Sequence, residues 1–195
     1  MNIITFYVNI QLKFLQNVGR QIMKNMVVRL SSLTLKNIKN VKNGTIVMPF
    51  TNERKIEYRK AEILGIYGQN GSGKTAIVDA LYFLQSVMIG EELDQRILEY
   101  IATDSINAEI NAEFKIFGDD VLYEVGYHVI FSKVNDGIII EREYLNCAVN
   151  KDGHRTNKNI FMDYQRNQTD VIFKPLKRLE ELNGSYCCTK NGRKE

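Results

Sequence analysis

A glycine-rich stretch that lies between two apolar patterns constrains this chain more than any other feature. It reads Gly68-Gln69-Asn70-Gly71-Ser72-Gly73-Lys74-Thr75 and satisfies the spacing G-x-x-x-x-G-K-[ST] of a phosphate-binding loop. An apolar run at residues 63–67 precedes it and a helix-period pattern follows it, which is the context that this motif needs. The sequence therefore predicts a strand, a phosphate-binding loop and a helix in succession. The alternative is a glycine-rich turn that carries one exposed lysine.

Each residue type in the loop suits phosphate binding. Glycine lets the backbone take positive φ and approach a ligand closely, so the N–H groups of residues 71–75 can point into one concavity. Lys74 supplies a mobile positive charge, the Thr75 hydroxyl is placed to coordinate Mg²⁺, and the helix N-terminus adds a partial positive charge. The expected nucleotide-binding residues are Gly68, Gln69, Asn70, Gly71, Ser72, Gly73, Lys74, Thr75 and Ala76, with Thr75 also the expected metal ligand.

Composition bounds the rest of the chain. The 195 residues, 44% of them hydrophobic, suit one globular domain with a core. The net charge is only +3, but residues 1–52 contain seven Lys or Arg and no Asp or Glu. A basic segment can attract nucleic acid or anionic lipid. We favour the simpler interpretation, a strand surface preceded by a flexible leader.

Cysteine and histidine usage gives no sign of disulfides or a metal site. Cys147, Cys187 and Cys188 form no C-x-x-C pair and no signal peptide precedes them, which fits a reducing, cytoplasmic location. His128 and His154 are far apart in sequence, so each is interpreted as a strand or turn residue. The longest apolar stretch is much shorter than the ~20 residues that a membrane helix requires, so no span is predicted.

The first 25 residues differ in pattern from the rest of the chain. They do not start with positive charge, and polar residues interrupt their apolar run, so they do not read as a secretory signal. Met26 stands just before the first convincing strand. We therefore expect residues 1–25 to be a leader or start-site extension and residues 26–195 to hold the domain.

Strand patterns flank the loop on its N-terminal side. Residues 27–35 alternate as a strand does, and residues 36–40 are expected to turn the chain. The turn signal Asn43-Gly44 then leads into a short partner strand at 45–48. Residues 63–67 are apolar at every position except Gly65, as in a central strand that is covered on both faces.

Helices and further strands are predicted after the loop. Apolar residues at i, i+3 and i+4 predict a helix over 74–89 that ends at Gly90, and a second short helix is expected within 91–101. Period-2 alternation then predicts three strands separated by short turns, which together form an antiparallel meander. These strands are expected at residues 106–116, 121–131 and 138–149.

This arrangement resembles the first half of an ABC-type nucleotide-binding domain, in the SMC/RecF-like branch of AAA-labelled ATPases. Residues 33–41, LTLKNIKNV, are similar to the opening strand and turn of that branch. The loop and the following AIVDAL are similar to its Walker A sequence G-x-N-G-S-G-K-[ST] and the helix after it. The resemblance covers residues 26–149 and implies an α/β P-loop NTPase fold, with the meander placed after the P-loop helix.

The resemblance also implies a mechanism. In that family, ATP lies between the phosphate loop of one nucleotide-binding half and a signature segment of another, and an Asp and a Glu at the end of an apolar strand hold Mg²⁺ and activate water. The implied cofactors are ATP and Mg²⁺, with residues 70–75 on the phosphates and Lys74 neutralising charge in the transition state. Lys36 and Asn37 are candidates for contact with the nucleotide, and an ordinary surface turn is the alternative.

The second half of the family pattern is not recognisable. Asp163 follows three apolar residues instead of four, and Tyr164 stands where the Glu should be. Residues 182–185 faintly resemble the signature segment, but only ten residues follow them. We therefore expect an N-terminal piece of a longer ATPase, or a truncated product, that binds nucleotide, has no catalytic residue of its own and does not hydrolyse ATP alone. Its expected partners are a second nucleotide-binding half or a C-terminal half, with DNA association through the full-length protein.

Two other functions fit parts of the sequence. A small P-loop kinase has a suitable length, but such kinases continue with alternating strands and helices. A degenerate, non-catalytic domain could instead bind a partner or nucleic acid through the basic N-terminal side, although few aromatic residues are interleaved with that charge. The biological process cannot be read from this sequence.

Overall fold

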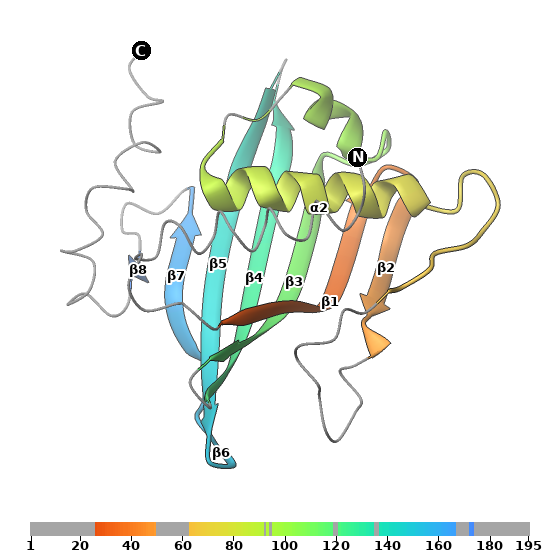
Figure 1. Cartoon of the computed structure of the whole chain (residues 1–195). Coiled ribbons are helices and arrows are strands. Elements are labelled where there is room, and N and C mark those ends of the chain that lie inside the picture. Colours follow the sequence, from red (N-terminus) through yellow and green to blue (C-terminus); the bar gives the residue numbers. More distant parts are fainter. Residues whose placement is uncertain are drawn as a thin grey trace.

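The computed structural model describes residues 26–49, 63–91, 93, 95–118, 121–134, 137–166 and 172–173. These residues form one long helix, one short 3-10 helix and a series of strands (Figure 1). In chain order the elements are β1 (Val27–Ile38), β2 (Val41–Val47), α2 (Lys74–Ile89), η2 (Gln95–Tyr100), β3 (Asn107–Gly118), β4 (Val121–Val134), β5 (Gly137–Lys151), β6 (His154–Arg155), β7 (Asn159–Gln165) and β8 (Ile172–Phe173).

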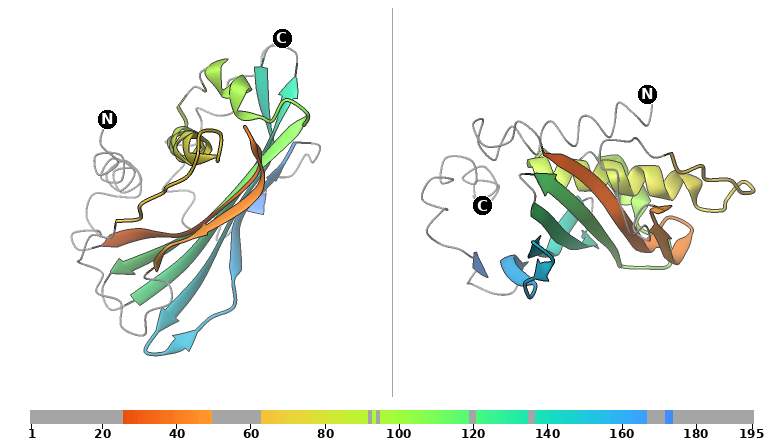
Figure 2. Two further views of the ribbon diagram at one scale, coloured as in Figure 1. Left: turned by 90° about the vertical axis from the view of Figure 1, so that its right-hand side faces the viewer. Right: turned by 60° about the horizontal axis from the view of Figure 1, so that its bottom comes forward.

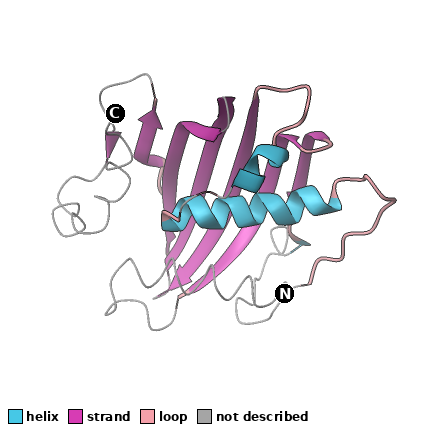
Figure 3. Ribbon diagram, turned by 90° about the horizontal axis from the view of Figure 1, so that it is seen from above, coloured by secondary structure: helices cyan, strands magenta, loops and turns pink. Residues whose placement is uncertain are grey.

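The strands form a single sheet in the order β2-β1-β3-β4-β5-β7-β8, and the short β6 pairs with β5. Every pairing is antiparallel. The helix α2 lies across one face of this sheet, so the described part has one helical layer and one sheet layer (Figures 2 and 3).

The core lies between α2 and the sheet. Residues that are directly opposite each other on antiparallel strands share a face, so the alternating residues of β1, β3 and β4 present one apolar surface to the helix. Phe83 of α2 and Phe131 of β4 are fully buried there, with ring centroids 4.2 Å apart. The buried sheet residues on this face are Val28, Leu30, Leu33, Leu35, Ala108, Ile110, Ala112, Phe114, Ile116, Tyr127, Val129 and Phe131. Burial of each large side chain contributes about 1.5–3 kcal/mol.

The opposite face of the sheet is polar. Ion pairs link strands, and the segment between β6 and β7, across it; each pair is partly exposed, so each one contributes little to stability. They are Lys36–Glu109 (2.7 Å), Arg155–Glu124 (2.6 Å), Arg142–Asp163 (3.1 Å) and Lys158–Glu113 (3.5 Å).

The predicted helix is observed with the predicted bounds. α2 spans Lys74–Ile89, and Gly90 ends it in the left-handed conformation, with φ 68°. Two other local predictions are wrong in detail. The chain turns at Lys39 and Asn40, within the turn predicted at residues 36–40, since Ile38 pairs with Val41. The Asn43-Gly44 signal lies inside β2, so the partner strand begins at Val41 and not at residue 45. The helix expected within 91–101 is a 3-10 helix.

The strand predicted at residues 63–67 is absent. These residues are irregular, and Ile63 and Tyr67 are 88% and 94% exposed. A strand forms only where a neighbouring strand supplies hydrogen bonds, and none of the described strands pairs with this segment. The apolar run is therefore an exposed surface beside the loop.

No helix among the described residues is long and apolar enough to cross a membrane. The predicted leader at 1–25, the signature-like residues 182–185 and the two C-terminal cysteines, Cys187 and Cys188, lie outside the described residues.

Candidate nucleotide-binding site

The glycine-rich loop extends beyond the β2 edge of the sheet, at the N-terminal end of α2 (Figures 1 and 3). Gly68, Gln69, Asn70, Gly71 and Ser72 are exposed, whereas Gly73 is buried where the loop meets the helix. The sequence motif is thus presented to solvent on a rigid base.

Two glycines give the loop its shape. Gly71 and Gly73 have φ values of 86° and 90°, in the left-handed region that side chains disfavour. A Cβ at Gly73 would also lie 2.6 Å from Cγ2 of Val41, the first residue of β2. The base of the loop therefore packs directly against the start of β2.

Lys74 lies at the centre of the loop. Its ammonium donates hydrogen bonds to the carbonyl oxygens of Gly68 and Gln69, both at 2.7 Å, and lies 3.4 Å from the Ser72 hydroxyl. The Ser72 N–H donates to the Gln69 carbonyl at 3.1 Å, which closes a turn around the ammonium. The loop thus wraps around a positive charge, as a phosphate cradle must.

The N-terminus of α2 is left open to an anion. Its N-cap residue is Gly73, which has no side chain to accept the first N–H groups, and no acidic residue stands in the first turn. The orphan N–H groups and the helix dipole therefore lack a negative partner from the helix itself. This arrangement fits the phosphates of a nucleotide.

A Mg²⁺ ion at this site would take most of its ligands from the nucleotide and water and not from the described side chains. Thr75 is exposed at the first turn, whereas Ala76 is buried in the core. No group of three or more His, Cys, Asp or Glu that could hold a metal occurs among the described residues. A Mg²⁺ ion here would take the Thr75 hydroxyl as a protein ligand and fill its other positions with phosphate oxygens and water, as Mg²⁺ commonly does.

Lys36 and Asn37 are held by β3. The Lys36 ammonium pairs with Glu109, and the Asn37 side-chain amide donates to the Asn107 carbonyl at 3.2 Å. The structure therefore favours the surface-turn interpretation of these two residues.

Sequence reasoning missed the hairpin residues that do approach the loop helix. Val41 contacts Gly73 at the loop base, and the Lys39 ammonium forms an ion pair with Asp79 of α2. One signal was available. Asp79 is the only acidic residue of α2 and lies five positions after Lys74.

Asp163, the nearest match to a catalytic acid, has a structural partner. It lies on β7, where Arg142 donates to both of its carboxylate oxygens at 3.1 Å. These hydrogen bonds raise the pKa of Arg142. β2 and β7 are five strand spacings apart in the sheet, or about 24 Å, so Asp163 is far from the loop.

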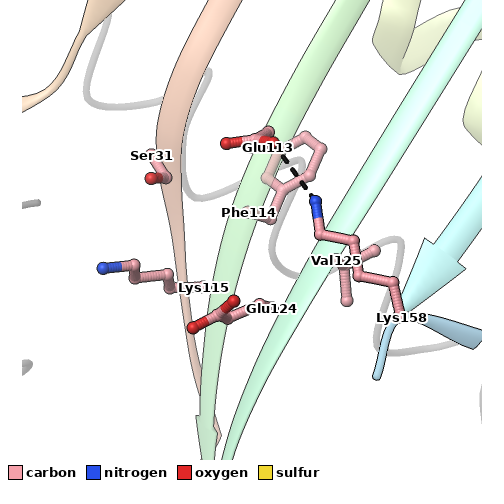
Figure 4. Close-up of a pocket in the computed structure, with 7 residues that line it drawn as sticks. All are labelled: Ser31, Glu113, Phe114, Lys115, Glu124, Val125 and Lys158. Carbon is pink, nitrogen blue, oxygen red and sulfur yellow. Dashed lines mark hydrogen bonds and ion pairs between the residues drawn. The ribbon is translucent and has the colours of Figure 1, made fainter. Parts of the chain in front are cut away.

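A small hollow on β1, β3 and β4 is also polar, but its charges balance. In Figure 4 the Lys158 ammonium reaches Glu113, and Lys115 and Glu124 lie below them. The complete lining is Ser31, Glu113, Phe114, Lys115, Glu124, Val125 and Lys158. With two lysines and two glutamates, the hollow selects neither anions nor cations.

Comparison with known proteins agrees with the loop chemistry. A family model described as an AAA domain matches residues 32–194. The DNA replication and repair protein RecF of Deinococcus radiodurans is 31% identical over 99 residues, which are 51% of this chain and 24% of that protein. The match thus spans about a quarter of the length of this curated relative.

Proposed function

Because this chain belongs to the AAA domain family, in its SMC/RecF-like branch, we propose that it is an ATP-binding module that takes up MgATP through its glycine-rich loop. One observation carries the proposal: the loop wraps around the Lys74 ammonium at the open N-terminus of α2. The proposed ligands are Gly68, Gln69, Asn70, Gly71, Ser72, Gly73, Lys74, Thr75 and Ala76, with Thr75 on Mg²⁺.

Each part of the loop has a role in this proposal. The N–H groups of residues 71–75 bind phosphate oxygens, and Lys74 exchanges its bonds to the loop carbonyls for bonds to phosphate. Charge-assisted bonds to phosphate are stronger than those to neutral carbonyls, so this exchange favours binding.

We also propose that hydrolysis requires a second nucleotide-binding half or a C-terminal half. The exposed apolar run supports this inference, because Ile63, Ile66 and Tyr67 leave large apolar side chains in water beside the loop. A partner that covers them would bury this surface and could bring a group that orients the attacking water. The name of the relative mentions DNA replication and repair, so we propose DNA association through the full-length protein and a cytoplasmic location.

Thermal unfolding with and without MgATP tests the proposal. At a ligand concentration of 100 times Kd, binding stabilises the fold by about 2.7 kcal/mol. For a domain of this size that corresponds to roughly 5–10 °C in Tm. Lys74→Ala should abolish the shift. Lys36→Ala is the matched control, since it removes a lysine that pairs with Glu109, and it should keep the shift. Equal protection of the Lys74→Ala variant by MgATP would refute the assignment.

A further inference from the structure

The turn between β1 and β2 has an unusual backbone. Lys39 has a φ of 51° and Asn37 a φ of 55°, both in the left-handed region. For a lysine this conformation costs about 1–2 kcal/mol and persists only where the surroundings impose it. The contacts of Lys39 show what imposes it here.

Three contacts hold Lys39 in place. Its N–H donates to the Tyr100 carbonyl at 2.7 Å, and its ammonium lies 5.2 Å from the centre of the Tyr100 ring. The same ammonium forms the ion pair with Asp79 on α2. Next to it, the Ala102 N–H donates to the Asn37 carbonyl at 2.9 Å. The turn is therefore fixed to the end of η2, to the residues just after it, and to α2.

The partner of Lys39 is well protected from water. The side chains of Lys39 and Asp79 are 29% and 19% exposed. The Oδ2 atom of Asp79 that meets the ammonium is buried and accepts no hydrogen bond from the described residues, so its contact with Lys39 is an ion pair alone. By contrast, the Lys42–Asp104 pair of the same hairpin is 63% and 61% exposed. Only the shielded pair is expected to matter energetically.

The shielded pair lies directly behind the loop. Asp79 stands on the second turn of α2, while Val41, two residues after Lys39, packs against Gly73, the N-cap residue of the helix. The hairpin thus touches the helix at two points, one on each side of Lys74 and Thr75. These two points fix the direction of the N–H groups at the start of α2.

We propose that Lys39 and Asp79 are positioning residues for the phosphate loop. Their ion pair clamps the β1–β2 turn onto α2 and so aims the helix N-terminus at the phosphates, without contact between either side chain and the nucleotide. This inference rests on the proposed function. Loss of the clamp should weaken MgATP binding by about 10-fold or more, as is usual when an outer-shell positioning group is removed.

The test compares charge-matched variants of the full chain, with the Kd for MgATP measured by calorimetry well below each Tm. The variant Lys39→Met/Asp79→Asn removes the pair without a change in net charge and should bind about 10-fold more weakly. The swapped variant Lys39→Asp/Asp79→Lys rebuilds the pair and should recover most of that loss. The control Lys42→Met/Asp104→Asn removes the exposed pair and should stay within about twofold of the parent.

The outcomes separate the clamp from the proposed function. If the parent chain does not bind MgATP, the proposed function and the clamp both fail. If the parent binds and the uncharged variant binds equally well, even with a lower Tm, the pair is merely structural and the clamp alone is refuted. Should the uncharged variant not fold, the swapped variant decides. If the swapped variant folds but binds MgATP 10-fold more weakly than the parent, the clamp is also contradicted.

Discussion

At the residue scale, Lys74 shows how the loop holds a positive charge in place. The carbonyl oxygens of Gly68 and Gln69 accept hydrogen bonds from its ammonium, and these bonds offset the repulsion between the ammonium and the N–H groups around it. In the proposed complex, phosphate oxygens would replace these carbonyls as stronger acceptors.

At the same scale, Glu143 makes the stability of the fold depend on pH. It lies on β5 opposite Val129, on the face that α2 covers, and the Tyr127 hydroxyl donates to its carboxylate. Burial raises the pKa of Glu143 above its ordinary value of 4.5, and the hydrogen bond from Tyr127 opposes part of this rise. Because the folded pKa is the higher one, the folded state holds the proton more tightly than the unfolded state.

The pH dependence follows from that sign. The stabilising contribution of protonated Glu143 is fully present below about pH 4.5 and is lost as the pH rises through the raised folded pKa. We expect the parent chain to lose stability relative to Glu143→Gln over this range, since the other carboxylates are common to both. Urea unfolding of the two proteins from pH 4.5 to 9 measures the difference. A difference that is independent of pH would show that Glu143 ionises as it does in water.

The motif residues could be singled out as candidates from sequence, but the Lys39–Asp79 ion pair could not. Lys74 and Thr75 are found by spacing alone, because the loop is local and each residue type has a fixed task. Lys39 and Asp79 are forty residues apart, and nothing in a single sequence pairs them. Their contact depends on how the hairpin packs on the helix, which is tertiary information.

At the element scale, α2 is bounded by two left-handed glycines that have different surroundings. A side chain at Gly73, with φ 90°, would meet Val41, whereas a side chain at Gly90, with φ 68°, would meet nothing within 4 Å. The two ends therefore separate backbone strain from steric contact within a single helix.

We expect Gly73→Ala to destabilise the chain more than Gly90→Ala. The second change carries only the cost of a left-handed alanine, about 1–2 kcal/mol. The first adds displacement of Val41, at about 1–3 kcal/mol, the usual cost of overpacking. Urea unfolding without nucleotide gives both values. If the two variants lose the same stability, Val41 moves freely and the loop base is not rigid.

Whether a helix, strand or turn was predicted correctly depended on how local its sequence signals are. The bounds of α2 were predicted correctly because apolar period, motif and terminal glycine all lie within the helix. The strand expected at residues 63–67 was wrong because its composition is suitable but its hydrogen-bonding neighbours are missing among the described strands. The turn predicted at residues 36–40 contains the observed one at Lys39 and Asn40, but the Asn43-Gly44 signal was wrong, because the chain has already turned at Lys39, which Tyr100 holds in place.

At the scale of the whole molecule, the charged residues that form ion pairs and the candidate site lie on different parts of the sheet. Its outer face is covered with cross-strand ion pairs, its inner face holds α2, and the loop extends from one edge beside the exposed apolar run. A surface with Ile63 and Tyr67 in water is costly for an isolated domain and suits an edge that another part of the protein covers.

This arrangement predicts that the chain by itself turns over ATP no faster than background. Phosphoryl transfer to water needs a group that orients the attacking water within reach of the γ-phosphate. Among the described residues, Asp79 and Asp104 are paired with Lys39 and Lys42, and Asp163 is paired with Arg142 on β7, five strand spacings (about 24 Å) from β2. Phosphate release from the parent chain and from Lys74→Ala should therefore be equally slow under conditions in which the parent binds MgATP. Hydrolysis that is fast and depends on Lys74 would mean that a water-orienting group lies within this chain, and the proposed need for a second half would be wrong.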